Sequence, residues 1–149
     1  MMAMKVLATN KRGRFDYDIT EKVMAGVELM GAEVKSIKAG HISLKGSFVA
    51  FRGTEGFLTN AHVSPYPYAH NSGELDPTRS RKLLLHKKEL ARLAGLKTQG
   101  LSVIPLAIGL ERNLVKVELG IGRGKKLFDK RSTIKEREVN RDIARKLTR

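Results

Sequence analysis

The chain has 149 residues and a formal net charge of +14, from 29 Lys and Arg against 15 Asp and Glu. It contains no cysteine, which excludes disulfides, thiol catalysis and cysteine-ligated zinc. An excess of this size is typical of a protein that binds nucleic acid or an anionic membrane. Aromatic residues make up only 5% and Trp is absent, so a wide base-stacking surface is not expected.

Residues 1–14 are expected to form a basic N-terminal arm, followed by one domain over residues 15–122 that is long enough for a single hydrophobic core. The N-terminus lacks an apolar stretch long enough for a signal peptide. No later run approaches the roughly 18 to 20 apolar residues that a spanning helix needs. A cytoplasmic protein without a membrane partner is therefore expected.

Two short strands are predicted at 15–19, where apolar and acidic residues alternate, and at 23–29. Residues 31–39 are predicted to form a short helix, because its apolar residues, such as Ile37, recur at helical spacing. Gly40 follows at the position where a helix usually ends with one residue in the left-handed conformation.

The segments 47–52 and 56–63 predict a β-hairpin, since each is apolar and a Gly-containing turn separates them. Residues 64–77 hold three of the four prolines and are predicted to be a loop. Residues 79–96 are predicted to be a helix.

Strands are predicted at 101–110 and 114–121, and Pro105 indicates that the first is an edge strand or carries a bulge. Several short strands with two helices between them favour a mainly β fold, a small, closed or nearly closed β-barrel of oligonucleotide-binding type flanked by helices. An open α+β sandwich is the alternative.

The C-terminal tail, residues 123–149, carries 11 Lys and Arg against 4 Asp and Glu, a net +7. A segment so charged and so poor in apolar residues is expected to be disordered when free. Capping-box spacing at Thr133 predicts that it becomes helical over 133–147 on a partner, with Gly122 and Gly124 as a hinge. A polyphosphate backbone suits it best, because each neutralised phosphate releases a counterion. A terminal helix docked on the barrel is the alternative.

An enzyme is disfavoured, because the four histidines lack ligand spacing and neither a nucleophile elbow nor a complete P-loop occurs. No catalytic residue, metal or cofactor is therefore expected. The apolar stripe of the tail is too narrow for an interfacial membrane helix. A structural ribosomal protein of the same fold stays open on composition alone.

Five blocks in one order resemble the SmpB family, the tmRNA-binding proteins of bacteria. These blocks are Asn10-Lys-Arg with Asp16-Tyr17, Gly31-Ala-Glu-Val-Lys-Ser36 with Ala39-Gly40, Asn60-Ala-His-Val-Ser-Pro65, Asp76 to His86, and Gly124-Lys-Lys with Asp129-Lys-Arg131. The resemblance implies a β-barrel adaptor without catalytic activity that binds the tRNA-like domain of tmRNA and delivers it to stalled ribosomes. It further implies a monomer, a tail that enters the decoding centre and the empty mRNA channel, and elongation factor Tu with GTP as an indirect partner through alanyl-tmRNA.

The resemblance also implies two sets of RNA-contacting residues. The expected tmRNA contacts are Asn10, Lys11, Arg12, Glu33, Lys35, Ser36, Arg79, Arg81, Lys82 and His86. The expected ribosome contacts in the tail are Lys125, Lys126, Phe128, Asp129, Lys130 and Arg131.

Structural alternatives accompany several of these assignments. Arg79 and Arg81 can instead pair with Asp76 or Glu74, and Glu33 can pair with a nearby Lys.

Three further residues depart from the family pattern. Met24 stands where the family usually has a Glu linked to tmRNA binding, and Phe15 stands where His is common. Phe128 stands where His or Tyr is frequent, so it keeps the capacity to stack on a base but loses the polar atom. Packing of Phe128 onto the barrel is the alternative.

Overall fold

The computed structural model describes residues 4–65 and 76–125 of the chain. Strands dominate the described residues, and three helices accompany them. In chain order the elements are β1 (Lys5–Thr9), α1 (Lys11–Asp16), β2 (Tyr17–Val27), α2 (Gly31–Lys38), β3 (Ile42–Ser43), β4 (Phe48–Arg52), β5 (Glu55–Thr59), β6 (His62–Val63), β7 (Arg81–Leu84), α3 (Lys87–Thr98), β8 (Ser102–Glu111) and β9 (Leu114–Gly124).

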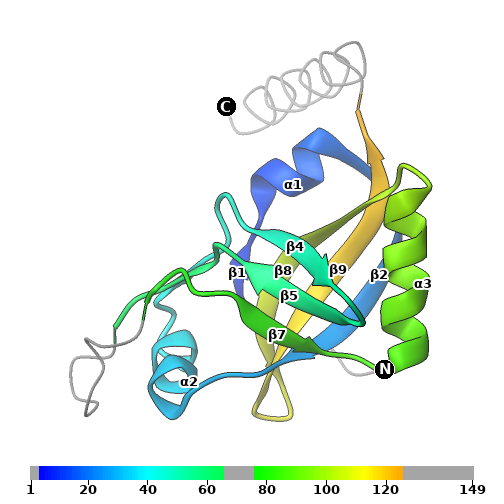
Figure 1. Cartoon of the computed structure of the whole chain (residues 1–149). Coiled ribbons are helices and arrows are strands. Elements are labelled where there is room, and N and C mark those ends of the chain that lie inside the picture. The colour runs from blue at the N-terminus through cyan, green and yellow to red at the C-terminus, as the bar shows by residue number, and fades with distance from the viewer. Residues whose placement is uncertain (1–3, 66–75, 126–149) are drawn as a thin grey trace, which may run out of the picture.

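Seven strands form one antiparallel sheet in the order β1-β8-β9-β2-β7-β5-β4, and β3 pairs with β6 in a separate small ladder. The sheet curls until β4 contacts β8 across the interior, so that β4 and β5 lie in front of β8 and β9 in Figure 1. The contact between β4 and β8 brings the sheet close to a barrel. Its edge strands β1 and β4 do not pair with each other, so the barrel is not fully closed. The predicted mainly β fold with flanking helices is confirmed in this form.

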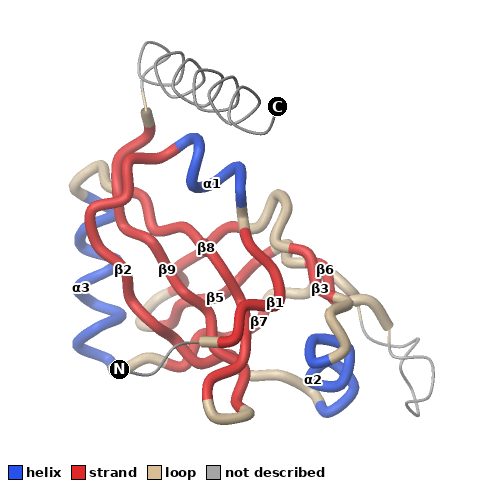
Figure 2. Tube along the Cα trace, turned by 180° about the vertical axis from the view of Figure 1, so that it is seen from behind, coloured by secondary structure: helices blue, strands red, loops and turns tan. Residues whose placement is uncertain are grey.

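The three helices lie around the periphery of the strands, as the view from behind shows (Figure 2). None of the helices within the described ranges is long and apolar enough to span a membrane.

The core lies inside the curled sheet. It includes Val117 and Leu119 of β9, which are fully buried and alternate with more exposed residues, and the strand predicted at 114–121 is confirmed.

The predicted short helix is confirmed, and so is the hairpin, although its second strand ends at Thr59 and residues 62–63 form the separate strand β6. β4 and β5 pair from Phe48↔Thr59 to Arg52↔Glu55, and α2 is followed by Gly40 with a φ of +86°. That φ is the left-handed conformation that a glycine adopts without steric cost.

The prediction of one helix over 79–96 is wrong, because residues 81–84 form strand β7 and only the later part forms α3. Arg81 and Leu83 are buried while Leu84 is exposed, which is the two-residue period of a strand. The Leu83–Leu85 run fits a buried strand as well as a helix, so the apolar pattern alone did not separate them.

The expected N-terminal arm differs from the structure too. Residues 5–9 form β1, which pairs with β8 from Lys5↔Leu110 to Thr9↔Ala107, and α1 replaces the start of the strand predicted at 15–19. The two strands predicted at 15–19 and 23–29 are parts of one long strand, β2, with a bulge between Ile19 and Glu21.

Pro105 lies in β8, which has β1 and β9 on its two sides and is therefore not an edge strand. The register with β9 shifts at Pro105, so of the two predicted alternatives the bulge is correct. The predicted hinge at Gly122 and Gly124 is wrong, because β9 pairs with β2 as far as Tyr17↔Gly124. A Cβ added at Gly122 would lie 2.0 Å from the backbone oxygen of Asp18, so this glycine permits close strand packing instead. The predicted helix over 133–147 lies outside the described residues.

Candidate nucleic-acid interface

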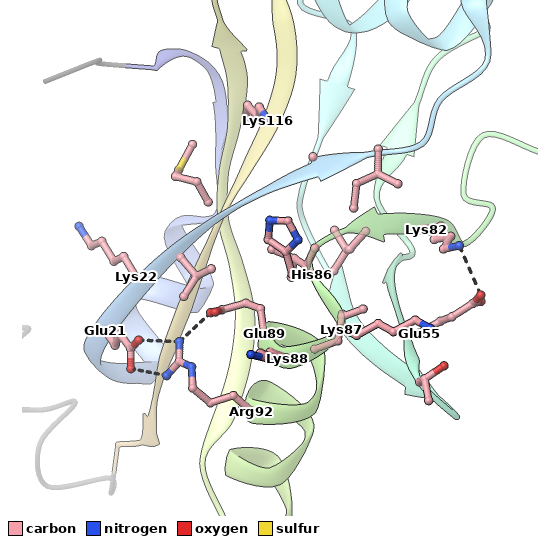
Figure 3. Close-up of a pocket in the computed structure, with 18 residues that line it drawn as sticks. Glu21, Lys22, Glu55, Lys82, His86, Lys87, Lys88, Glu89, Arg92 and Lys116 are labelled. Atoms are coloured by element: carbon pink, nitrogen blue, oxygen red, sulfur yellow. Dashed lines mark hydrogen bonds and ion pairs between the residues drawn. The ribbon is translucent and has the colours of Figure 1, made fainter.

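A groove of about 1050 Å³ opens between β2 and the start of α3 (Figure 3). It exists because β2 and β7 pair only at Gly26↔Leu84 and Val27↔Leu83. After these pairs β7 ends, the chain turns into α3, and β2 continues alongside β9.

The floor of the groove is apolar. Met24 and Leu84 are 40% and 52% exposed there, although large apolar side chains are usually covered. A Cβ added at Gly26 would lie 3.2 Å from Cβ of Leu84, so the glycine leaves room for that leucine across the strand pair. An exposed apolar floor suits the flat faces of bases and sugars.

The rim of the groove is cationic, with six Lys and Arg against three Glu, a local excess of three positive charges. Three of these cations form no ion pair with any other described residue, and they are Lys87, Lys88 and Lys116. Lys82 pairs with Glu55 at 3.3 Å, and Lys22 pairs with Glu118 at 3.7 Å. The unpaired cations are available to an anionic ligand.

Arg92 closes one end of the groove by joining α3 to β2. It donates from Nη1 to Oε2 of Glu21 at 3.1 Å and from Nη2 to Oε1 of Glu89 at 2.7 Å (Figure 3). These hydrogen bonds, first to Glu21 and then to Glu89, raise the pKa of Arg92 above its ordinary value. Arg92 therefore positions the groove wall, and the lysines remain for ligand contact.

His86 lies in the groove at the residue that precedes α3. Its side chain makes no capping hydrogen bond and is exposed. A neutral imidazole both donates and accepts, which suits the 2′-hydroxyl that distinguishes RNA from DNA. Two of the expected tmRNA contacts, Lys82 and His86, thus lie together here.

Asn10 lies at the opposite end of β2, where it supports α1. Its Oδ1 accepts from the backbone N of Gly13 at 3.0 Å, and its Nδ2 donates to the carbonyl of Pro105 at 2.9 Å. The side chain is thus a helix cap and a link to β8, and it is buried. Its polar atoms are occupied by protein partners.

Lys11 and Arg12 are exposed beside a second, smaller pocket of about 420 Å³ that Lys45 also lines. Arg12 donates from Nε to Oδ2 of Asp16 at 3.2 Å, an exposed pair that contributes little stability. This cationic pocket is separate from the groove, because the two have no lining residue in common.

Glu33 of α2 holds two arginines, neither of which pairs with Asp76. Arg79 donates to it from Nε at 3.0 Å, and Arg81 donates from Nε at 2.6 Å. Arg81 is 1% exposed and donates further to the carbonyls of Ala61, Arg79 and Pro77. Burial raises the pKa of Glu33, but hydrogen bonds from Arg79, the Met30 backbone and Arg81 outweigh burial and hold it below its usual range.

Ser36 and Lys35, neighbours on α2, have different surroundings. Ser36 is fully buried and donates from Oγ to the carbonyl of Ser64 at 2.6 Å. Lys35 is exposed. This helix is therefore anchored through its inner polar side chains and presents its lysine outward.

The structure separates the expected tmRNA contacts into two groups. Four of them, Asn10, Glu33, Ser36 and Arg81, are buried with protein partners that support the fold, and their contact with RNA stays a prediction. Arg79 is partly exposed but bound to Glu33. The accessible ones are Lys11, Arg12, Lys35, Lys82 and His86.

Of the ribosome contacts expected in the tail, only Lys125 lies within the described residues. It is half-buried, and its backbone N donates to the carbonyl of Asp16 at 2.8 Å. Lys126, Phe128, Asp129, Lys130 and Arg131 lie outside the described residues.

Sequence reasoning missed most of the residues that line the groove, including Lys22, Leu84, Lys87, Lys88 and Lys116. One signal was present, because the alternation of β9 places Lys116 on the face opposite Val117. Within residues 4–65 and 76–125, no group of three or more His, Cys, Asp or Glu is placed to hold a metal ion.

A small basic protein with a nearly closed β-sheet and a lysine-rimmed, apolar-floored groove belongs to the class of nucleic-acid-binding β-sheet proteins. More specifically, the chain belongs to the SmpB protein family, whose model matches residues 7–149.

Curated relatives match over nearly the whole chain. The SsrA-binding protein of Synechococcus sp. (strain JA-2-3B'a(2-13)) is 51% identical, over 97% of this chain and 94% of its own. That of Caldicellulosiruptor saccharolyticus is 49% identical, over 97% and 91%. A solved structure described as "tmRNA-SmpB: a journey to the center of the bacterial ribosome" matches with a TM-score of 0.63 and 47% identity, covering 80% of this chain and 84% of that one.

Proposed function

We propose that this protein is an RNA-binding adaptor that binds the tRNA-like domain of tmRNA and delivers it to stalled ribosomes, where incomplete peptides are tagged. Family membership and the similarity to SsrA-binding proteins support this function. The observation that carries it is the groove, in which unpaired lysines surround an exposed apolar floor.

The groove can bind RNA through two kinds of contact. Lys87, Lys88 and Lys116 neutralise phosphates, which releases counterions and supplies affinity that does not depend on sequence. Met24 and Leu84 contact the apolar faces of sugars or bases. Because Met24 carries no carboxylate, this chain binds here through apolar contact where the family usually has Glu.

The remaining partners follow the family. We place the protein in the cytoplasm as a monomer without catalytic activity, with elongation factor Tu and GTP associated indirectly through alanyl-tmRNA. The tail residues Lys125, Lys126, Phe128, Asp129, Lys130 and Arg131 contact the decoding centre and the vacant mRNA channel in this proposal. In this proposal the groove and the smaller cationic pocket bind tmRNA, and the tail residues contact the ribosome.

Binding of the tRNA-like domain at several salt concentrations tests the groove. A variant with Lys88→Gln and Lys116→Gln should bind severalfold more weakly, and the slope of log K against log salt should become less negative by about 0.9 for each phosphate that is no longer neutralised. The matched control combines Lys38→Gln and Arg112→Gln, which removes equal charge at exposed positions outside the groove. Equal binding by the two variants would reject the groove as the RNA site.

A truncation after Lys126 tests the division of labour between body and tail. The shortened protein should keep the tRNA-like domain affinity of the full chain and lose peptide tagging on stalled ribosomes. Tagging by the shortened protein would show that the tail is dispensable.

A further inference from the structure

The outer face of β7, β5 and β4 continues the face that forms the groove floor. Leu84 of β7 is the register partner of Gly26 in β2. On the other side of β7, Lys82 is the register partner of Phe57 in β5, and Phe57 is in turn the partner of Ala50 in β4. Since side chains alternate along a strand, Phe48 shares the face of Ala50. One continuous outer surface therefore runs from Leu84 to Phe48.

Burial identifies which face of these strands is the outer one. The intervening residues Val49, Leu58 and Leu83 are at most 3% exposed and belong to the core. In Figure 1 the strands β4, β5 and β7 lie at the front of the molecule, and no described helix lies over them. This surface is open within the described part of the chain.

Two of the described phenylalanines lie on this surface, which we call the aromatic face and define by Phe48, Arg52, Phe57 and Lys82. Phe48 is 48% exposed, and Phe57 is half-buried. The guanidinium carbon of Arg52 lies 5.7 Å from the centre of the Phe57 ring, a cation–π arrangement. Exposed rings beside cations are the pattern on which nucleic-acid bases stack.

We infer that the aromatic face binds unpaired bases of the same RNA that occupies the groove, with Phe48 as the principal stacking ring. This inference rests on the proposed function. RNA is the occupant, because the face is continuous with the lysine-rimmed groove and carries cations of its own. The bases must be unpaired, since a base within a duplex has no face free for a ring.

The charge of this face is small, because Glu55 pairs with Lys82 at 3.3 Å and leaves Arg52 as the excess cation. Base stacking therefore supplies most of the binding free energy that the aromatic face contributes, and this part depends little on salt. That separates the aromatic face from the groove, whose lysines make binding strongly dependent on salt. Within the described residues the platform is narrow, with the two rings of Phe48 and Phe57.

Phe48→Ala tests the inference directly. Its affinity for the tRNA-like domain of tmRNA should fall about tenfold, within the range of base-stacking contributions, while the slope of log K against log salt stays that of the unaltered protein. Phe48→Leu keeps the apolar bulk but lacks the ring, and it should lose nearly as much. Leu114→Ala is the matched control, because it truncates a 62% exposed apolar residue away from this face.

A fluorescent reporter gives an independent readout, because the chain has no Trp. In Phe48→Trp, binding of the tRNA-like domain should quench the single indole, whereas a fully paired RNA duplex should not. If the unaltered protein binds the domain but Phe48→Ala binds equally well and the indole is unchanged, this inference is overturned and the proposed function stands. If the unaltered protein does not bind the domain, both fail.

Discussion

Arg81 and Glu33 form a buried ion pair across 48 positions of the chain, with 2.6 Å between Nε and Oε2. The pair joins α2 to β7. Because side chains alternate along β7, the buried position of Arg81 directs Lys82 toward the outer face and the groove. Arg81, which was expected to contact RNA, therefore directs its neighbour Lys82 toward the outer face.

Removing the carboxylate of this pair should destabilise the fold. Glu33→Gln leaves two arginines without their counter-charge, and loss of one partner of a buried ion pair costs about 3 to 5 kcal/mol. Urea unfolding measures the change in free energy. Glu28→Gln, an exposed position, is the control and should stay within about 0.5 kcal/mol of the original protein. Equal stability of the two variants would contradict the structural role of Glu33.

The same carboxylate predicts part of the acid sensitivity. The folded-state pKa of Glu33 lies below its ordinary value, so the unfolded chain binds a proton more readily at acid pH. Its contribution is therefore complete above the unfolded pKa of about 4.3 and is lost as pH falls through the folded pKa. The free-energy difference between the original protein and Glu33→Gln should shrink as pH decreases below about 4. A difference that stays constant down to about pH 2 would contradict this assignment.

Two glycines should respond oppositely to alanine. A Cβ at Gly109 would lie 2.1 Å from the backbone oxygen of Lys5, so Gly109→Ala must displace β1 and should cost about 1 to 3 kcal/mol. Gly95 lies within α3 with nothing within 4 Å of an added Cβ, so Gly95→Ala should stabilise by about 0.5 to 1 kcal/mol. Thermal unfolding of the two variants would reveal the opposite signs.

The smaller cationic pocket gives a prediction about RNA. Lys11→Gln should weaken binding of the tRNA-like domain and flatten its salt dependence, since Lys11 is exposed beside that pocket. Filter binding at several salt concentrations measures both quantities. An unchanged slope would remove Lys11 from the RNA interface.

Much of the sheet was predictable, because its signals are local. The hairpin of β4 and β5 and the long pair of β8 and β9 each combine alternating apolar residues with a nearby turn. β1 was missed because its partner β8 lies about a hundred positions later, and residues 5–9 read alone as a basic arm. Pairing with a distant strand overrode the local composition.

The candidate site was less predictable. Residue type identified Lys82 and His86, but it also selected Arg81 and Glu33, which neutralise each other inside the fold. Lys88 and Lys116 were not selected, because a single exposed lysine carries no signal until the fold places it beside others. Which charges meet protein and which meet solvent depends on contacts between distant segments.

The ladder between β2 and β9 continues to the hydrogen bond from Lys125 to Asp16 at 2.8 Å, the last residue described. Residues 126–149 thus start from one anchored point beside α1, and even fully extended these 24 residues reach no farther than about 86 Å. Where the body docks therefore sets the centre of a sphere within which residues 126–149 must act. A small rotation of the docked body would shift that sphere and bring a different part of the surrounding assembly within range.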